Sequence, residues 1–224
     1  MTHQNTNSPQ RHLPVRPNLD QLKRQAKELL AKAKSGEPSA LLELSQAAKG
    51  ASPKLADAQH ALALSYGAPH WNRLQLACQV CDAIWQNRVE DLRDLVLKHP
   101  YLLVESVRVQ PDNWGPPLSY SANLGRDEII SMLLGLGASD IQKAFDRACL
   151  QGRLETARLL FAQGAGLPRG CIMGPCETLN ADGLKLLLEL GAEFCDESGS
   201  RLAPLALILQ TYSRNPQGKA RCLH

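Results

Sequence analysis

The chain has 224 residues and a net charge of +3, with 44% hydrophobic and only 4% aromatic residues. This length allows one large domain or two small ones. A core with so few aromatic side chains is built mainly from Leu and Ala, which suits helices packed on helices. Val and Ile runs at strand spacing are missing, so the sequence predicts an all-α protein and argues against a sheet.

The charge pattern and the absence of long apolar runs limit the kinds of partner and the cellular compartment that the sequence predicts. The excess of basic residues lies before Lys54, without a polybasic tail, which is typical of a solvated helix face rather than of a nucleic-acid partner. No stretch reaches about 18 apolar residues, so no membrane partner is expected. The first 14 residues lack the apolar core of a secretory signal, and seven irregularly spaced cysteines fit reduced thiols. A cytoplasmic protein is therefore expected.

Residues 15–82 are predicted to form a small helical module that follows a disordered N-terminus, residues 1–14. The first helix has an amphipathic pattern, and Asn18 is its predicted N-cap. Its predicted apolar face consists of Leu19, Leu22, Ala26, Leu29, Leu30 and Ala33. A shorter helix is expected at about 39–48.

Two more helices are predicted in the second half of this module. Ser52 is expected to cap a helix that Pro53 opens, with Gly67 just past its end. The predicted face of that helix consists of Leu55, Ala58, Leu62 and Tyr66. Pro69 is expected to open the next helix, which carries Trp71, Leu74 and Ala77.

The second half of the chain contains segments that repeat at a period of 27 residues. The segments MLLGLGA (132–138), LLFAQGA (159–165) and LLLELGA (186–192) superpose without gaps. Upstream, Gly125 matches Gly152 at the same period. Glycine permits the tight turn between two helices, while the leucines form a face that only a neighbouring unit can bury. The pattern therefore predicts stacked helix pairs.

Residues 116–138, PPLSYSANLGRDEIISMLLGLGA, resemble an ankyrin repeat, whose first helix has the signature T-P-L-H-x-A. Pro116 takes the place of the family's Thr, Ser119 that of its His and Ser121 that of its Ala. Weaker copies lie at 83–100, where Asn87 takes the turn position, and at 202–209, LAPLALIL. The N-terminal module is similar to a helical segment that precedes the repeats of some bacterial ankyrin proteins.

The resemblance implies an ankyrin-repeat α-solenoid over residues 83–224. About five units are expected, at 83–100, 111–138, 139–165, 166–192 and from about 199. A period of 27 is six residues shorter than the usual ankyrin repeat, so the projecting loops are expected to be short at 138–142 and 165–171 and longer at 101–115 and 192–202. The last unit is expected to be incomplete, as in a truncated chain, with its second helix beginning near Gln217.

The resemblance also implies a non-catalytic scaffold that binds a protein partner, so far unidentified, through its concave face and finger loops. Transferred by repeat register, the partner-binding residues are Asn113, Trp114, Asn123, Leu124, Leu150, Gln151 and Glu177. Trp114 has two interpretations: it packs under its loop, or it contacts the partner, since aromatic residues are enriched at interaction hot spots. The oligomeric state is left open.

No residue pattern indicates catalysis, a cofactor or a metal. Cys78-x-x-Cys81 has no second ligand pair at zinc-site spacing, because Cys171 and Cys176 lie about 90 residues away. The six histidines show no catalytic spacing, and Gly-rich phosphate loops are absent. An alternative hypothesis places an effector or enzyme activity in the N-terminal module, with the repeats as a targeting domain. A third, nucleic-acid binding, has only the basic segment around KRQAK (23–27) to support it.

Overall fold

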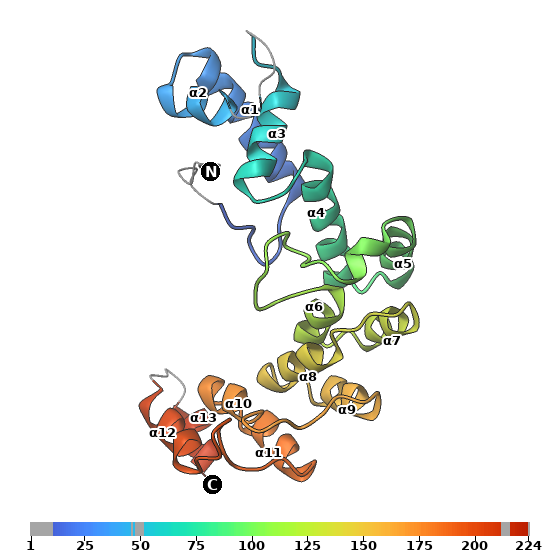
Figure 1. The fold of residues 1–224 in the computed structure, drawn as a ribbon, viewed down its shortest axis with the longest axis vertical. Coiled ribbons are helices and arrows are strands. Elements are labelled where there is room, and N and C mark those ends of the chain that lie inside the picture. The colour runs from blue at the N-terminus through green and yellow to red at the C-terminus, as the bar shows by residue number, and fades with distance from the viewer. Residues whose placement is uncertain (1–10, 46, 48–51, 212–215, 224) are drawn as a thin grey trace, which may run out of the picture. The chain divides into compact units, whose positions relative to one another are not determined.

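The computed structural model describes residues 11–45, 47, 52–211 and 216–223 (Figure 1). Over these residues the protein is all-α, as predicted: helices alternate with turns and loops, and the described part contains no strand. None of the described helices has the length and apolarity needed to cross a membrane. The chain divides into two compact units. Unit 1 consists of Met1–Gln86 with Ser106–Asn113, and unit 2 of Asn87–Glu105 with Trp114–His224.

The described residues of unit 1 form a cluster of four helices built around the first one. They are α1 (Leu19–Lys34), α2 (Pro38–Ser45), α3 (Leu55–Ser65) and α4 (Trp71–Trp85). Helix α1 contacts each of the other three, and α3 also contacts α2 and α4. The predicted amphipathic pattern of α1 is the reason: Leu22, Ala26, Leu29 and Ala33 are buried. The predicted N-cap is also confirmed, since Asn18 accepts a hydrogen bond from the Gln21 backbone N–H (2.9 Å).

Two helices of unit 1 begin later than the prolines suggested. Helix α3 begins at Leu55 rather than at Pro53, because the Asp57 carboxylate accepts from the Lys54 backbone N–H (2.7 Å) and so makes Lys54 the cap. Helix α4 begins at Trp71, where the His70 ring nitrogen Nδ1 accepts from the Arg73 backbone N–H (3.2 Å). Side-chain acceptors therefore decide both starts.

Residues 11–14 are ordered in the structure, which corrects the prediction of a disordered N-terminus for this part; residues 1–10 lie outside the described residues. Leu13 is buried in the core with Leu62 and Leu74. The Arg11 backbone N–H donates to the Ser65 carbonyl (2.8 Å). The polar composition of the first 14 residues suggested disorder, but the buried Leu13 side chain and the Arg11 backbone hydrogen bond hold residues 11–14 in place.

Residues 106–113 pack in unit 1, although the sequence pattern assigned them to the second domain. The buried Arg73 donates to the Ser106 carbonyl (2.8 Å). Gln110 Nε2 donates to the carbonyls of Arg11 (3.1 Å) and Tyr66 (2.9 Å). Gln110 thus supplies a donor to two backbone carbonyls of unit 1, and these contacts hold the segment there.

Unit 2 begins with α5 (Val89–Lys98) and a short 3₁₀ helix, η1 (Pro100–Leu103), and its described residues continue with four helix pairs. The pairs are α6 (Pro117–Leu124) with α7 (Asp127–Gly135), α8 (Ile141–Leu150) with α9 (Leu154–Ala162), α10 (Met173–Thr178) with α11 (Ala181–Glu189), and α12 (Leu202–Gln210) with α13 (Pro216–Leu223). The first helices contact one another in series, α6 with α8, α8 with α10 and α10 with α12 (Figure 1). The second helix of the last pair begins at Pro216, close to the predicted Gln217.

The backbone of unit 2 repeats at the same period as the sequence. Gly125, Gly152 and Leu179 end the first helices of three pairs in the left-handed conformation, with φ of 65°, 65° and 55°. Asn87 has a φ of 54°, as its predicted turn role requires. The second helices also end alike: the N–H groups of Ala138, Ala165 and Ala192 donate to the carbonyls of Leu133, Leu160 and Leu187, at 3.0, 3.1 and 2.9 Å.

Buried side chains and polar contacts hold successive pairs of unit 2 in register. Tyr120 and Phe145, on α6 and α8, are fully buried. The Ser119 backbone N–H and hydroxyl both donate to the Asp140 carboxylate at the start of α8. Further along, Thr156 Oγ1 donates to the Asp127 carboxylate (2.5 Å). Each of these polar bonds joins one helix pair to the next.

Candidate functional site

Three successive first helices of unit 2 end in side chains that the structure leaves at least partly exposed. Leu124, Gln151 and Thr178 each immediately precede a left-handed residue, and Leu150 and Glu177 come one position earlier. We call these five residues the helix-end row. Gln151, Glu177 and Thr178 are exposed, whereas Leu124 and Leu150 are half-buried. Because α6, α8 and α10 stack in series, the row continues from one helix end to the next.

Asn123 was predicted to contact a partner, and the structure corrects this. Its side chain is only 2% exposed. Its Nδ2 donates to the Ser119 carbonyl (2.8 Å), and its Oδ1 accepts from Arg147 Nε (2.8 Å). Both ends of the amide are therefore used inside unit 2, and Asn123 joins α6 to α8 instead of facing a partner.

A glycine explains why the equivalent position in the next pair stays accessible. Leu150 lies one repeat period after Asn123, and Gly174 lies one period after Arg147. Arg147 covers Asn123, but Gly174 has no side chain, and a Cβ built there would lie 3.4 Å from Leu150 Cδ1. Leu150 therefore keeps part of its surface.

The other two predicted contact residues lie before α6. Trp114 is half-buried, and its ring lies on that of the fully buried Tyr120, with 4.9 Å between the centroids. Packing thus accounts for one side of Trp114, and only the remaining surface is open to a partner. Asn113 is exposed and belongs to unit 1, whereas the other predicted contact residues belong to unit 2.

Thr178 is the position that the sequence interpretation missed. It lies one repeat period after Gln151, and its hydroxyl donates to the Gly174 carbonyl within its own helix (3.1 Å). The sequence contained the signal, because extending the match of Gly125 and Gly152 by one more period reaches Leu179. The sequence interpretation missed this third turn because position 179 is a leucine, and the left-handed conformation is uncommon for residues other than Gly, Asn and Asp.

Three buried cysteine thiols, those of Cys78, Cys149 and Cys176, have raised pKa values. Burial, followed by the nearby Asp82 charge, raises the pKa of Cys78 to about 11. Burial is also the main cause that raises the pKa of Cys149 and Cys176 to about 12 each. Only a thiolate is an effective nucleophile or metal ligand, so these groups are structural. Within the described residues, no group of three or more His, Cys, Asp or Glu side chains is arranged to hold a metal ion.

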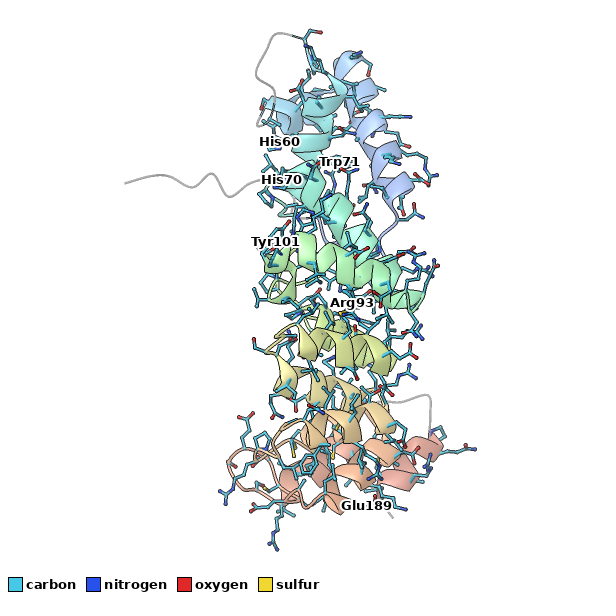
Figure 2. All side chains as sticks on the ribbon, turned by 90° about the vertical axis from the view of Figure 1, so that its right-hand side faces the viewer. His60, His70, Trp71, Arg93, Tyr101 and Glu189 are labelled. Carbon is cyan, nitrogen blue, oxygen red and sulfur yellow. The ribbon has the colours of Figure 1, made fainter. Side chains whose placement is uncertain are left out.

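Two of the described histidines, His70 and His99, make contacts that have a structural role. His70 caps α4, next to Trp71, which packs against the core of unit 1 (Figure 2). The His99 ring lies edge-on to Tyr101, with 5.9 Å between the centroids. Neither contact pairs an imidazole with a Ser, Thr or Cys side chain that it would activate as a nucleophile.

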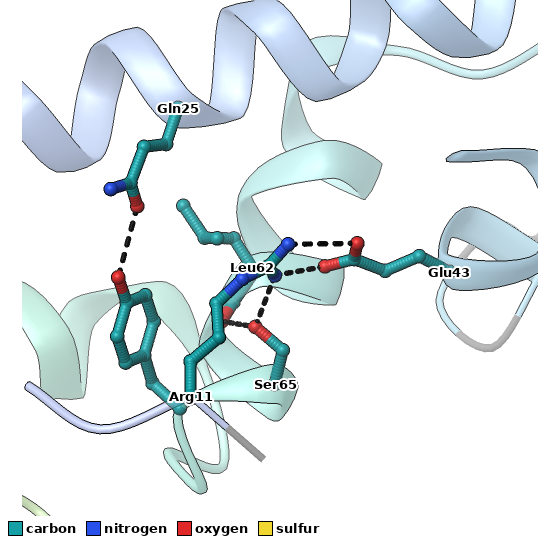
Figure 3. Close-up of polar contacts among 6 residues, drawn as sticks. Arg11, Gln25, Glu43, Leu62 and Ser65 are labelled. Atoms are coloured by element: carbon teal, nitrogen blue, oxygen red, sulfur yellow. Dashed lines mark hydrogen bonds and ion pairs between the residues drawn. The ribbon is translucent and has the colours of Figure 1, made fainter. Parts of the chain in front are cut away.

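Unit 1 has a polar cavity of about 190 Å³ between α1, α2 and α3. Four of its charged side chains form ion pairs, Arg11 with Glu43 and Lys32 with Glu37. Arg11 donates to both carboxylate oxygens of Glu43 and to the Ser65 hydroxyl, and Tyr66 donates to Gln25 (3.0 Å) (Figure 3). Small-molecule sites are usually larger and mostly apolar. The network therefore explains how the segment before α1 is anchored and requires no ligand.

A second hollow, of about 300 Å³, lies in unit 2 between the α10–α11 turn and α13. Its lining is polar, and the charged pair that faces it, Arg221 with Asp182, is already joined in an ion pair. Asn180 also belongs to this lining, and its side chain accepts from the Gly183 backbone N–H (3.0 Å), which caps α11. These contacts give the hollow a structural explanation.

No protein-family model matches the sequence, and no curated protein matches it.

Proposed function

We propose that this chain is an ankyrin-repeat protein, with residues 83–224 as the solenoid, and that it acts as a non-catalytic scaffold for a protein partner. The supporting observation is the helix-end row, which presents side chains that are at least partly exposed at the same point of three stacked helix pairs. In a repeat protein the residues that stack are fixed by the signature, and the exposed positions between them determine the partner.

The chemistry of the helix-end row favours a protein surface as the ligand. It combines two half-buried leucines with a neutral amide, a hydroxyl and one carboxylate. Such a mixture offers apolar contact area together with hydrogen bonds, as protein interfaces do. A nucleic acid would need clustered Lys and Arg side chains, and none of the five residues is basic.

The low reactivity of the other groups supports a non-enzymatic role. Cys149 and Cys176 have strongly raised pKa values. Arg11 pairs with Glu43 beside the cavity of unit 1, and Arg221 pairs with Asp182 beside the hollow of unit 2. Reduced, buried thiols also support the proposed cytoplasmic location. The alternative, an effector activity within unit 1, predicts a cofactor or metal that copurifies in stoichiometric amount.

The test compares two double variants of the full chain as baits in affinity purification with quantitative mass spectrometry. Gln151→Arg with Glu177→Arg alters the helix-end row. Gln163→Arg with Glu155→Arg makes the same chemical changes at exposed positions of α9 and its C-terminal end. We expect a protein captured by the wild type to be lost, by at least about tenfold, only with the first variant, which corresponds to about 1.4 kcal/mol.

Direct titration of the captured protein against the wild type and both variants then measures affinity, which the amount captured from a lysate does not give by itself. Equal affinity of wild type and the row variant would remove the helix-end row as the contact surface. A stoichiometric cofactor or metal in the purified chain, with catalytic turnover, would favour the alternative function instead.

A further inference from the structure

The loop that precedes α10 and the loop that follows α11 lie against each other within unit 2. A Cβ built on Gly170 would lie only 2.9 Å from the Glu197 backbone nitrogen and 3.4 Å from the Asp196 carbonyl carbon. One built on Gly199 would lie 3.6 Å from Arg169 Nη1. Residue numbers therefore rise along one loop as they fall along the other, so the two segments run antiparallel.

Each of the two loops carries one cysteine, and the antiparallel run places these cysteines side by side. Cys171 follows Gly170 and Cys195 precedes Asp196, so one further step along both segments pairs Cys171 with Cys195. Neighbouring extended segments in direct contact lie about 5 Å apart. That separation is inside the limit of about 7 Å that a disulfide sets between the Cα atoms of its two cysteines.

Contacts of the neighbouring charged groups agree with this placement. A single carboxylate oxygen, Glu193 Oε2, lies 3.4 Å from Arg169 Nε and accepts from the Cys195 thiol at 3.6 Å. A residue of the first loop thus reaches the thiol of the second. Burial is the main cause that raises the pKa of Cys171, the Asp146 charge is the next, and Cys195 contributes further through a charge interaction that weakens with distance.

The two thiols differ in accessibility, and this difference assigns their roles. Cys171 is half-buried, so a small oxidant reaches its sulfur, whereas Cys195 is only 3% exposed. The Asp146 and Glu193 carboxylates stand near these thiols, so an uncharged oxidant approaches more readily than an anionic one. We propose that Cys171 and Cys195 form a redox pair that hydrogen peroxide converts into a disulfide.

The reaction proceeds in two balanced steps. The Cys171 thiol and hydrogen peroxide give a sulfenic acid and one water. The Cys195 sulfur then attacks the sulfenic sulfur: the S–S bond forms, the S–O bond breaks, and the hydroxide leaves with the Cys195 proton as a second water. Because only the thiolate reacts well, the raised pKa of Cys171 makes the first step slow. Disulfides of cytosolic proteins are usually transient, so a reversible bond agrees with the proposed cytoplasmic location.

The position of the two cysteines determines what the bond would do. Cys171 precedes α10 and Cys195 follows α11, so the disulfide closes a loop around a whole helix pair. A bond of this kind restrains the unfolded state of the segment that it encloses. Cys149 is a second thiol near Cys171, but it lies on α8, where helical hydrogen bonds fix its backbone, and it is only 1% exposed.

Peptide mapping of the full chain by mass spectrometry tests the proposal. The reduced protein is treated with hydrogen peroxide, its remaining thiols are alkylated in denaturant, and the chain is cleaved with trypsin and cyanogen bromide. Cleavage after Met173 and Lys185 places Cys171, Cys176 and Cys195 on three separate fragments. We expect the fragments of Cys171 and Cys195 to be joined, and a dithiol reductant to separate them again.

Two variants, checked for folding by circular dichroism, complete the test. Cys149→Ser is the matched control and should form the same cross-link as the wild type. Cys195→Ser should form none, and dimedone should instead trap the sulfenic acid on Cys171. Oxidation should slow amide hydrogen exchange over residues 172–194 in the wild type and leave it unchanged in Cys195→Ser.

The map of the wild type is decisive even where a variant fails to fold. A cross-link between Cys149 and Cys171 would overturn the proposal, as would a mixture of pairings. A Cys171 that stays unreacted, or that is oxidised beyond the sulfenic acid without any disulfide, would overturn it as well.

Discussion

Arg147 Nε lies 2.8 Å from Asn123 Oδ1, and this hydrogen bond joins α8 to α6. The donor is charged and the acceptor is buried, and the other end of the Asn123 amide donates to the Ser119 carbonyl. Asn123, which the repeat pattern predicted to bind a partner, therefore connects two helix pairs instead. Its position in the sequence pattern and its role in the structure differ because the neighbouring helix supplies an arginine.

Replacement of Asn123 by Ala should destabilise the protein by about 1–3 kcal/mol, because Arg147 loses an acceptor and the Ser119 carbonyl loses a donor. Gln151→Ala, at an exposed position of the helix-end row, should change stability by less than about 0.5 kcal/mol. Urea unfolding followed by far-UV circular dichroism measures both. Equal effects of the two substitutions would show that the Asn123 bonds contribute little.

The two turn glycines of unit 2 should respond differently to alanine. Both have a φ of 65°, so each substitution carries a left-handed strain of about 1–2 kcal/mol. At Gly152 a Cβ would also lie 2.6 Å from Asn180 Nδ2 and displace the side chain that caps α11. At Gly125 the nearest atom is the flexible Arg153 side chain, at 3.3 Å.

We therefore expect Gly152→Ala to cost about 2–4 kcal/mol and Gly125→Ala about 1–2 kcal/mol in the same unfolding assay. The difference between the two isolates the cap from the turn. If Gly125→Ala proved the more harmful of the pair, the assigned role of Asn180 as an N-cap would be wrong.

Leu13 tests whether the segment before α1 belongs to the core. A buried leucine replaced by Ala typically costs about 2–5 kcal/mol, whereas the same change in a disordered segment costs nothing measurable. His12→Ala, at the exposed neighbouring position, serves as the control. Thermal and urea unfolding of both variants should show a loss for Leu13→Ala alone, and matching curves would restore the original expectation of disorder.

The buried Cys149 thiol predicts a loss of stability at alkaline pH. Its pKa in the folded chain is raised by burial from 9.0 to about 12. Below pH 9 the thiol is protonated in both states, so it adds no pH dependence. Between pH 9 and about 12 the unfolded chain ionises while the folded chain does not, so stability falls as the pH rises.

Urea unfolding at several pH values measures this effect, and Cys149→Ala supplies the comparison because Tyr and Lys residues titrate in the same range. Above pH 9 the stability of the wild type should fall more steeply than that of the variant. Parallel curves would mean that the folded thiol ionises as easily as the unfolded one. Slow alkylation of Cys149 at pH 8 in the native protein should accompany the steeper fall.

Much of the helical layout of this protein could be predicted from residue pattern. The buried face of α1, the Asn18 cap, the left-handed turns at Asn87, Gly125 and Gly152 and the all-α class follow from local rules. Turn geometry depends on nearby residues, so a periodic match in sequence reappears as a periodic match in φ. The first residues of α3 and α4 were less predictable from proline positions, because the Asp57 and His70 side chains accept backbone hydrogen bonds that set where each helix begins.

The exposed positions were only partly predictable. Gln151 and Glu177 are exposed at the expected helix ends, whereas Asn123 is buried, and Thr178 was overlooked. Exposure depends on which side chain the next helix brings alongside, Arg147 in one pair and Gly174 in the following one. Transferring contact residues from one repeat to the next assumes that the repeats are identical. The difference between Arg147 and Gly174 instead decides which side chains a partner could reach.

The sequence by itself determined where the chain turns and which helix faces are apolar, since both depend on residues a few positions apart. Only the tertiary structure decided that Leu13 and residues 106–113 belong to unit 1, that Asn123 is an internal support and that Leu202 and Leu209 of α12 are exposed. Those outcomes depend on contacts between segments distant in sequence, where one buried leucine or one satisfied carbonyl outweighs local composition.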